Sequence, residues 1–203
     1  MRGTIGVGRT LALLAVWVAG PGGAAAGQAL PEWLRREMSE LVADGGRWIT
    51  DNRPYQSDDE PFDAYGLEWK WGVGQASITG RLYGLREGRE VATFWEFRMD
   101  RHPGTGEVRL MQWGAGGALG VGPLRPTGNG VETEAVQVFF APDGTSRRVR
   151  HLTVTENGEH RTRSFDEVDG RWVPGRTYVW KRAAGPGRAD PAGGAESNDR
   201  GGS

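Results

Sequence analysis

The chain of 203 residues contains no cysteine. This absence excludes disulfides, thiol catalysis, cysteine-ligated zinc and a lipidated N-terminal cysteine, so packing alone has to hold the fold together. The chain also lacks a charge excess, with a net charge of -1 and a pI near 6.3. Because such a small charge gives no field that attracts polyanions, nucleic acid is not expected as a partner.

Long apolar segments are missing too. An apolar run at 10–20 is too short to cross a bilayer as a helix, but it follows two arginines and precedes a run of small residues. This is the pattern of a secretory signal peptide. We therefore predict a signal peptide over 1–26, cleaved after Ala26 or after Ala29, and a mature chain without a transmembrane segment. The predicted location is periplasmic or extracellular.

No nucleophile elbow, zinc-protease helix or phosphate-binding loop occurs in the sequence, so no enzyme class, metal or cofactor is predicted. What the chain has in abundance is glycine, with 34 residues, and tryptophan, with 9. Abundant glycine is typical of many turns and short strands. Tryptophans are usually buried, either in a core or around an apolar ligand. The length predicts one domain.

Hydrophobic spacing predicts a helix followed by a series of strands. Residues 31–44 have apolar positions on one helical face and lie between a proline and a glycine pair. The polar stretch 51–66 is broken by prolines and is predicted as a loop. Beyond it the period is two, and short turns such as Asn157-Gly158 and Asp169-Gly170 recur.

Short connections make consecutive strands antiparallel neighbours. We predict an all-β, up-and-down meander of about eight to ten strands that closes into a barrel, because so long a sheet has to remove its edges. The predicted organisation is a signal peptide, a helical lead-in over 27–44, a barrel over 45–182 and a tail over 183–203. The tail has no aliphatic residue larger than alanine and is predicted to be disordered.

The barrel region resembles the lipocalin-like (calycin) barrels of bacterial secreted proteins. The residues that carry the resemblance are Gly46 and Trp48 near the first strand and the ending DGRWVPGRTYVWKR, which places Trp and Tyr on the last strand. The export signal and the strand order agree with it. The resemblance implies a barrel around a small apolar ligand.

The stretch ATFWEFRMDRHPGTGEVRLMQWG at 92–114 is predicted to be two strands and a turn. His102 precedes a proline and is predicted to be a turn residue. For the second strand, the pattern leaves open whether Val108 and Leu110 or Met111 and Trp113 point inward. On the first strand, the alternation predicts an inward face of Val91, Thr93, Trp95, Phe97 and Met99.

If Asn157-Gly158 and Asp169-Gly170 each form a two-residue turn, the last three strands share two faces. One face carries aromatic residues and arginines, and the other carries two histidines and small hydroxyl residues. Arg176 and Tyr178 are similar to the Arg-x-Tyr pair with which fatty-acid-binding proteins hold a carboxylate. In that hypothesis one face, which includes Arg163, Phe165, Trp172, Arg176 and Tyr178, lines a ligand site. The alternative places the arginines of this face outside the barrel, with their stems over the tryptophans and their charges paired with Glu167. The face carries five arginines, at 148, 150, 161, 163 and 176, and burying five positive charges in one lumen without counter-charges costs free energy.

The opposite face carries His151 and His160, which are too far apart to chelate one ion. One of them could serve as an axial haem ligand, as in barrels related to nitrobindin, but ordinary polar strand residues explain them as well. An acidic segment at 57–63, with Asp58, Asp59 and Glu60, lacks calcium-loop spacing and is predicted to be a solvated loop.

These patterns predict an exported barrel that binds a small apolar or amphipathic acid such as a fatty acid. The alternative is a structural or interaction protein of the cell envelope, with its barrel filled by its own side chains and with 31–44 and 51–66 as contact surfaces. A haem-binding barrel and an enzyme are the remaining classes. A cavity larger than about 300 Å³ separates the first hypothesis from the second.

Overall fold

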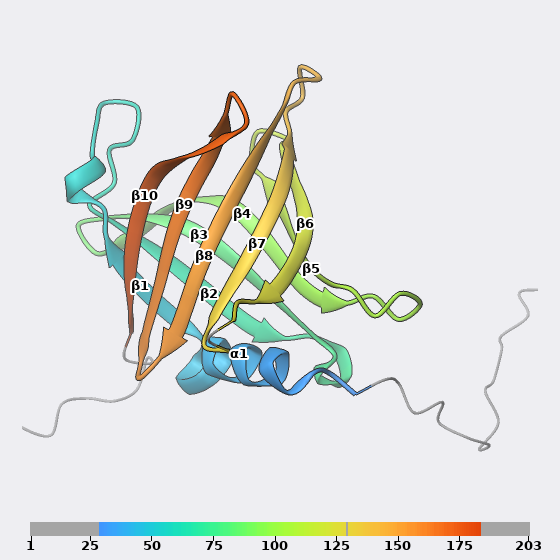
Figure 1. The fold of residues 1–203 in the computed structure, drawn as a ribbon. Helices are drawn as coiled ribbons and strands as arrows, with labels where there is room; N and C mark the ends of the chain where they lie inside the picture. Colours follow the sequence, from blue (N-terminus) through green and yellow to red (C-terminus); the bar gives the residue numbers. More distant parts are fainter. Residues whose placement is uncertain (1–28, 129, 184–203) are drawn as a thin grey trace, which may run out of the picture.

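The computed structural model describes residues 29–128 and 130–183. The predicted signal peptide, and the predicted tail apart from Ala183, lie outside these residues. The described chain forms ten antiparallel strands that close into a barrel, in which each strand pairs with its neighbours in sequence and the last pairs with the first (Figure 1). This confirms the predicted all-β meander. No helix within the described ranges is long and apolar enough to cross a membrane.

One α-helix, α1 (Glu32–Val42), precedes the barrel. The strands are β1 (Arg47–Asp51), β2 (Ala64–Trp71), β3 (Ser77–Arg86), β4 (Arg89–Arg101), β5 (Val108–Gly114), β6 (Leu119–Pro126), β7 (Glu132–Phe140), β8 (Ser146–Glu156), β9 (Glu159–Val168) and β10 (Arg171–Arg182).

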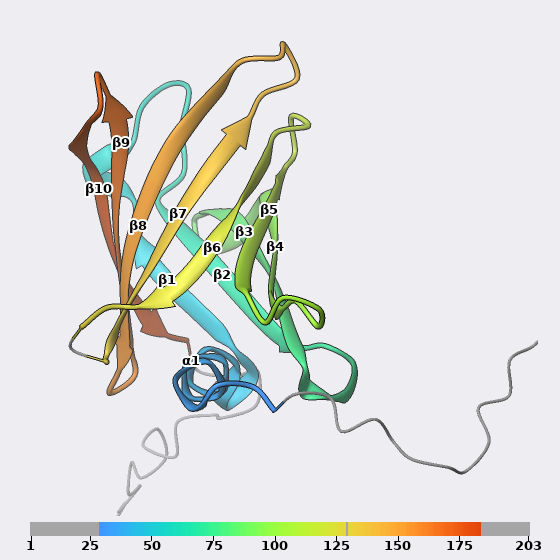
Figure 2. The ribbon, with the colours of Figure 1, turned by 45° about the vertical axis from the view of Figure 1, so that its right-hand side comes forward.

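Helix α1 lies across one end of the barrel, together with the turns that follow β2, β4, β6 and β8 (Figures 1 and 2). We call this end the floor. The other end, called the mouth, carries the 52–63 loop between β1 and β2 and the turns that follow β3, β5, β7 and β9. Since Leu34, Met38 and Leu41 of the helix are almost fully buried, the helix closes the floor by apolar packing.

The junction of helix and barrel depends on one glycine and one tryptophan. Gly46 has a φ of 65°, and a Cβ there would lie 2.1 Å from the carbonyl oxygen of Trp69, so no other residue fits. Two residues later the fully buried Trp48 donates its indole N–H to the carbonyl oxygen of Leu41 at 2.9 Å. The Gly46-x-Trp48 pair therefore fastens the floor helix to β1.

Both tight turns of the last three strands set the predicted register. Asn157 and Asp169 have φ values of 53° and 52°, each is followed by a glycine of positive φ, and the pairs Glu156–Glu159 and Val168–Arg171 flank them. These are the backbone angles of two-residue hairpin turns. The register beside both turns is confirmed.

A bulge then changes the faces of β10. The pairing with β9 shifts between Pro174 and Thr177, where Gly175 lies so close to β9 that a Cβ would meet Ser164 Oγ at 2.7 Å. Because the bulge adds a residue to one strand, the alternation reverses across it. Trp172 therefore stays outside while Arg176 points inward, and the prediction that they share one face is wrong.

A second bulge alters β4. Trp95 pairs with Leu82 and Thr93 pairs with Tyr83, so Phe94 has no pairing partner in β3 and turns inward. Val91 is 54% exposed and Thr93 is exposed as well, so the prediction that these two point inward is wrong. The inward positions of Trp95, Phe97 and Met99, which follow the bulge, are confirmed.

The turn after β4 contains His102, and the strand that follows it, β5, has one clearly buried face. His102 accepts hydrogen bonds at Nδ1 from the backbone N–H groups of Gly104 and Thr105, at 3.2 and 3.0 Å, so it is a turn residue as predicted. On β5, Val108 is buried and Leu110 faces the interior, whereas Trp113 is 43% exposed. This fixes the face of β5 that the sequence left open.

Candidate functional site

The barrel encloses a cavity of about 900 Å³. It extends from Glu37 and Leu41 of the floor helix to Ser57 and Glu60 of the loop at the mouth. A barrel filled by its own side chains does not have such a space. The volume lies in the range of sites that enclose small molecules, which is about 300–1,000 Å³.

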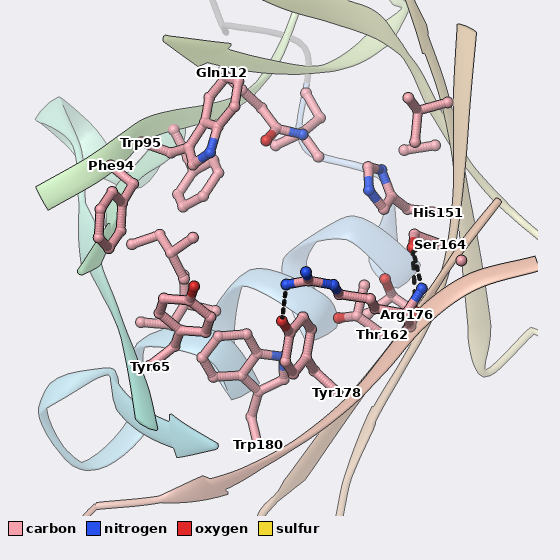
Figure 3. A pocket seen from close by; sticks show the side chains of 18 of the residues that line it. Tyr65, Phe94, Trp95, Gln112, His151, Thr162, Ser164, Arg176, Tyr178 and Trp180 are labelled. Atoms are coloured by element: carbon pink, nitrogen blue, oxygen red, sulfur yellow. Dashed lines mark hydrogen bonds between the residues drawn. The ribbon is translucent and has the colours of Figure 1, made fainter. Parts of the chain in front are cut away.

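One half of the cavity wall is aromatic. It is formed by β10, β2 and β4, whose rings contact one another, with centroids 5.9 Å apart for Tyr65 and Tyr178 and 5.4 Å apart for Trp69 and Phe97 (Figure 3). We call this half the aromatic wall. Its rings are Tyr65, Trp69, Phe94, Trp95, Phe97, Tyr178 and Trp180.

The other half, from β5 to β9, carries most of the uncharged polar groups of the cavity. We call it the polar wall. Its side chains come mainly from alternate positions of β8 and β9, which the two-residue turn between these strands places side by side. They are Gln112, Thr133, His151, Thr153, His160, Thr162 and Ser164.

Arg176 enters the cavity near the mouth because of the β10 bulge. Its guanidinium donates to both carboxylate oxygens of Glu60, at 2.5 and 2.7 Å, and to the hydroxyl of Tyr178 at 3.1 Å. Tyr65 donates its hydroxyl to the same carboxylate. The hydrogen bonds from Arg176 lower the pKa of Glu60 and keep it ionised. The site is therefore a carboxylate bound by a guanidinium and by the phenol of Tyr65, with a second phenol, that of Tyr178, bound to the guanidinium.

Five of the predicted ligand-binding residues line the cavity, and the structure brings them together around one space. They are Trp95, Phe97, Met99, Arg176 and Tyr178.

The other three predicted residues lie on the outer surface. Trp172 lies under the guanidinium of Arg148 at 5.5 Å, and Phe165 lies under that of Arg150 at 5.7 Å. Arg163 pairs with a glutamate of β7 at 2.6 Å. Their arrangement is the predicted alternative, in which arginines cover aromatic rings and pair with carboxylates. It arises because the bulge turns Arg176 and Tyr178 to the face opposite that of these three residues.

The floor of the cavity contains a hydrogen-bonded chain that was not predicted. Thr155 donates its hydroxyl to Glu37 at 2.9 Å and contacts Nδ1 of His160 at 2.7 Å, and Thr162 contacts Nε2 at 3.3 Å. With Thr155 as the donor to Glu37, the network assigns the ring proton of His160 to Nδ1, from which the hydroxyl then accepts.

Burial dominates the ionisation of both floor groups. It raises the pKa of Glu37 to about 7 and lowers that of His160 to about 4, so the imidazole is neutral. A signal for Glu37 was present in the sequence, since it lies three residues after Leu34 and four before Leu41 and so belongs to the apolar face of the helix.

His151 is the other histidine of the polar wall. Burial lowers its pKa to about 4, and its Nδ1 is buried without a hydrogen-bond partner. Of the two candidate haem ligands, His160 has both nitrogens hydrogen bonded within the wall, whereas His151 has neither. Within residues 29–128 and 130–183, no group of three or more His, Asp or Glu side chains is arranged to hold a metal ion.

The acidic loop at the mouth is tied to the barrel by hydrogen bonds and an ion pair. Besides the ion pair of Glu60, Asp63 accepts the backbone N–H of Glu87 at 2.6 Å, and the side-chain amide of Asn52 donates to the carbonyl oxygen of Phe62 at 3.0 Å. Tyr178 donates its hydroxyl to Asn52 at 3.1 Å. The loop is thus held over the cavity through residues that also line it or contact its lining.

Comparisons with protein-family models, with curated proteins and with solved structures find no match for this chain. The functional conclusion therefore depends on the barrel, its cavity and the side chains that line it.

Proposed function

We propose that this chain is an exported, lipocalin-like barrel that binds a small apolar or amphipathic acid, such as a fatty acid. One observation carries the proposal: Arg176 faces a cavity of about 900 Å³ and already holds a carboxylate there, that of Glu60, while it donates to the hydroxyl of Tyr178 beside it. The aromatic wall beside them supplies the apolar contact. Export follows from the predicted signal peptide.

In this proposal the carboxylate of the acid replaces the carboxylate of Glu60. The exchange substitutes one ion pair for a similar one, so the charges contribute little to net affinity. The favourable free energy comes from the apolar body, since each buried methylene contributes about 0.8 kcal/mol. Arg176 then serves to place the acid at the mouth with its chain toward the floor.

The test is binding of dodecanoic acid to the mature protein, measured by calorimetry and by displacement of a fluorescent fatty acid. We expect Arg176→Met to weaken binding at least about tenfold, the effect of losing about 1.4 kcal/mol. Arg163→Met is the matched control, because Arg163 also pairs with a glutamate and its side chain is similarly exposed, at 46% against 43%, but it lies outside the barrel.

The control variant should bind as the wild type does. Native mass spectrometry of protein purified from its own host should also show a retained acid. A wild-type protein that carries no small molecule and binds no acid would falsify the proposal.

A further inference from the structure

His151 is polar, points into the cavity and has nothing to bind there (Figure 3). Its Nδ1 is buried without a partner, no hydrogen bond to Nε2 is found in the described chain, and the ring lies in a T-shaped contact with Phe139, with centroids 6.5 Å apart. The charges that act on it, Asp166 and Arg147, pair with each other at 3.0 Å. An unpaired buried polar group costs about 1–3 kcal/mol, so such a group calls for an explanation.

Gln112 presents a second unused group to the same space (Figure 3). Its side-chain N–H donates to Gln137 at 2.6 Å, and Gln137 in turn donates to the carbonyl oxygen of Leu110 at 3.0 Å. This relay fixes the orientation of the Gln112 amide. The amide oxygen of Gln112 has no hydrogen-bond donor among the described residues, so a fixed acceptor faces the cavity.

Several other polar groups of the wall already form hydrogen bonds within the protein. Ser164 bonds the backbone of Arg176, at 3.0 and 3.2 Å, and so supports the bulge. Thr162 contacts His160. His151 and Gln112 can therefore accept a ligand bond without giving up one of their own, as can the hydroxyls of Thr133 and Thr153, for which no side-chain hydrogen bond is found in the described chain.

Both groups are uncharged, which defines the chemistry they can bind. A neutral imidazole offers one donor and one acceptor, and an amide oxygen is an acceptor. A ligand hydroxyl can donate to Gln112 and accept from His151, and a ligand carbonyl can accept from His151. A second carboxylate would meet no positive charge from either residue.

We infer that the bound acid carries an uncharged oxygen group, a hydroxyl or a carbonyl, part-way along its apolar body, and that His151 and Gln112 bind this group. The inference depends on the proposed function, because Arg176 holds the acid end of the same molecule. It narrows the ligand class from fatty acids in general to oxygenated amphipathic acids.

The experiment compares dodecanoic acid with its positional hydroxy and oxo isomers, and with the methyl esters of those isomers, by calorimetry. In the wild type, the best isomer should bind at least about tenfold more tightly than the parent acid, as one satisfied buried hydrogen bond allows. His151→Leu and Gln112→Met should each reduce this preference to about threefold or less. The readout is the ratio of isomer affinity to parent affinity in each variant, because both residues line the cavity and their replacement also alters contacts with the apolar chain of the parent acid.

Met99→Leu is the control, since it alters the cavity lining without altering a polar group. It should keep the preference of the wild type. Equal binding of all isomers, or a preference that survives in His151→Leu, overturns the inference and leaves the acid proposal intact.

Two further outcomes separate the proposals. Tight binding of the hydroxylated esters without binding of any acid removes the acid proposal but supports the oxygen site. A Soret band with haemin that is lost in His151→Leu overturns the inference, because the imidazole would then be a metal ligand.

Discussion

The two ends of the cavity each contain a glutamate, and the pKa values of the two are shifted in opposite directions. Glu60 at the mouth is held by the guanidinium of Arg176, which lowers its pKa. Glu37 at the floor is 6% exposed, and its side chain is hydrogen bonded by Thr155; burial raises its pKa to about 7. The environment, and not the residue type, therefore decides in which direction the pKa of each glutamate shifts.

The two ends also differ in how strongly they are held closed. The floor is sealed by a helix whose apolar face is buried, and removing such side chains costs about 2–5 kcal/mol each. The loop at the mouth is held by hydrogen bonds and by an ion pair of partly exposed groups, and each of these contributes only about 1 kcal/mol. A ligand is therefore expected to enter at the mouth, where opening costs least.

The largest expected effect is on stability and concerns Glu37, because its burial at the floor disfavours the ionised carboxylate. A carboxyl group whose pKa is higher in the folded state stabilises the fold least above that pKa. For Glu37, with a pKa of about 7 against an ordinary 4.5, stability is full below about pH 4.5 and is lost as the pH rises through 7. The loss reaches about 3 kcal/mol. Glu37→Gln should remove it.

The measurement is urea unfolding of the wild type and the variant at pH 5 and pH 8. The two proteins should be similar at pH 5, and Glu37→Gln should be about 3 kcal/mol more stable at pH 8. Glu40→Gln, on the same helix but ion-paired with Arg182 at 3.2 Å, controls for a general change in helix charge. A difference between wild type and Glu37→Gln that is the same at both pH values would show that Glu37 does not titrate in this range.

The second largest effect is expected when the hydroxyl of Thr155, which links Glu37 to His160, is removed. Thr155→Val keeps the shape of the side chain but leaves Glu37 and Nδ1 of His160 without their partner. We expect a loss of about 2 kcal/mol in the free energy of unfolding at pH 5. Thr162→Val is the comparison variant, because its contact with His160 is longer, at 3.3 Å, and its loss should be smaller. Equal losses would mean that the floor chain has no special role.

Sequence pattern was sufficient for the barrel but not for all of its faces. Turn motifs such as Asn157-Gly158 determine a local register, and the strands next to them follow it. The alternation fails after Pro174 and around Phe94, where bulges add a residue to one strand. A bulge is a property of two paired strands, so one strand alone gives little sign of it.

The candidate site was predictable to the same extent. Trp95, Phe97 and Met99 were placed correctly because they follow one another on an unbroken stretch of β4. The partner of Arg176 was not predicted, since Glu60 is 116 positions away in the sequence and only closure of the barrel brings them together. Side chains that lie far apart in sequence are joined by topology, and a local pattern does not contain it.

The smallest effect on stability, with a clear effect on binding, is expected at the mouth. Glu60→Gln removes the internal anion of Arg176 and should change the free energy of unfolding by less than about 1 kcal/mol, because the pair is partly exposed. Since a ligand carboxylate then competes with no resident carboxylate, affinity for dodecanoic acid should rise about three- to tenfold. Glu167→Gln, which removes the partner of Arg148 outside the barrel, should leave the affinity unchanged. If the affinity is unchanged in Glu60→Gln as well, acids do not bind at Arg176.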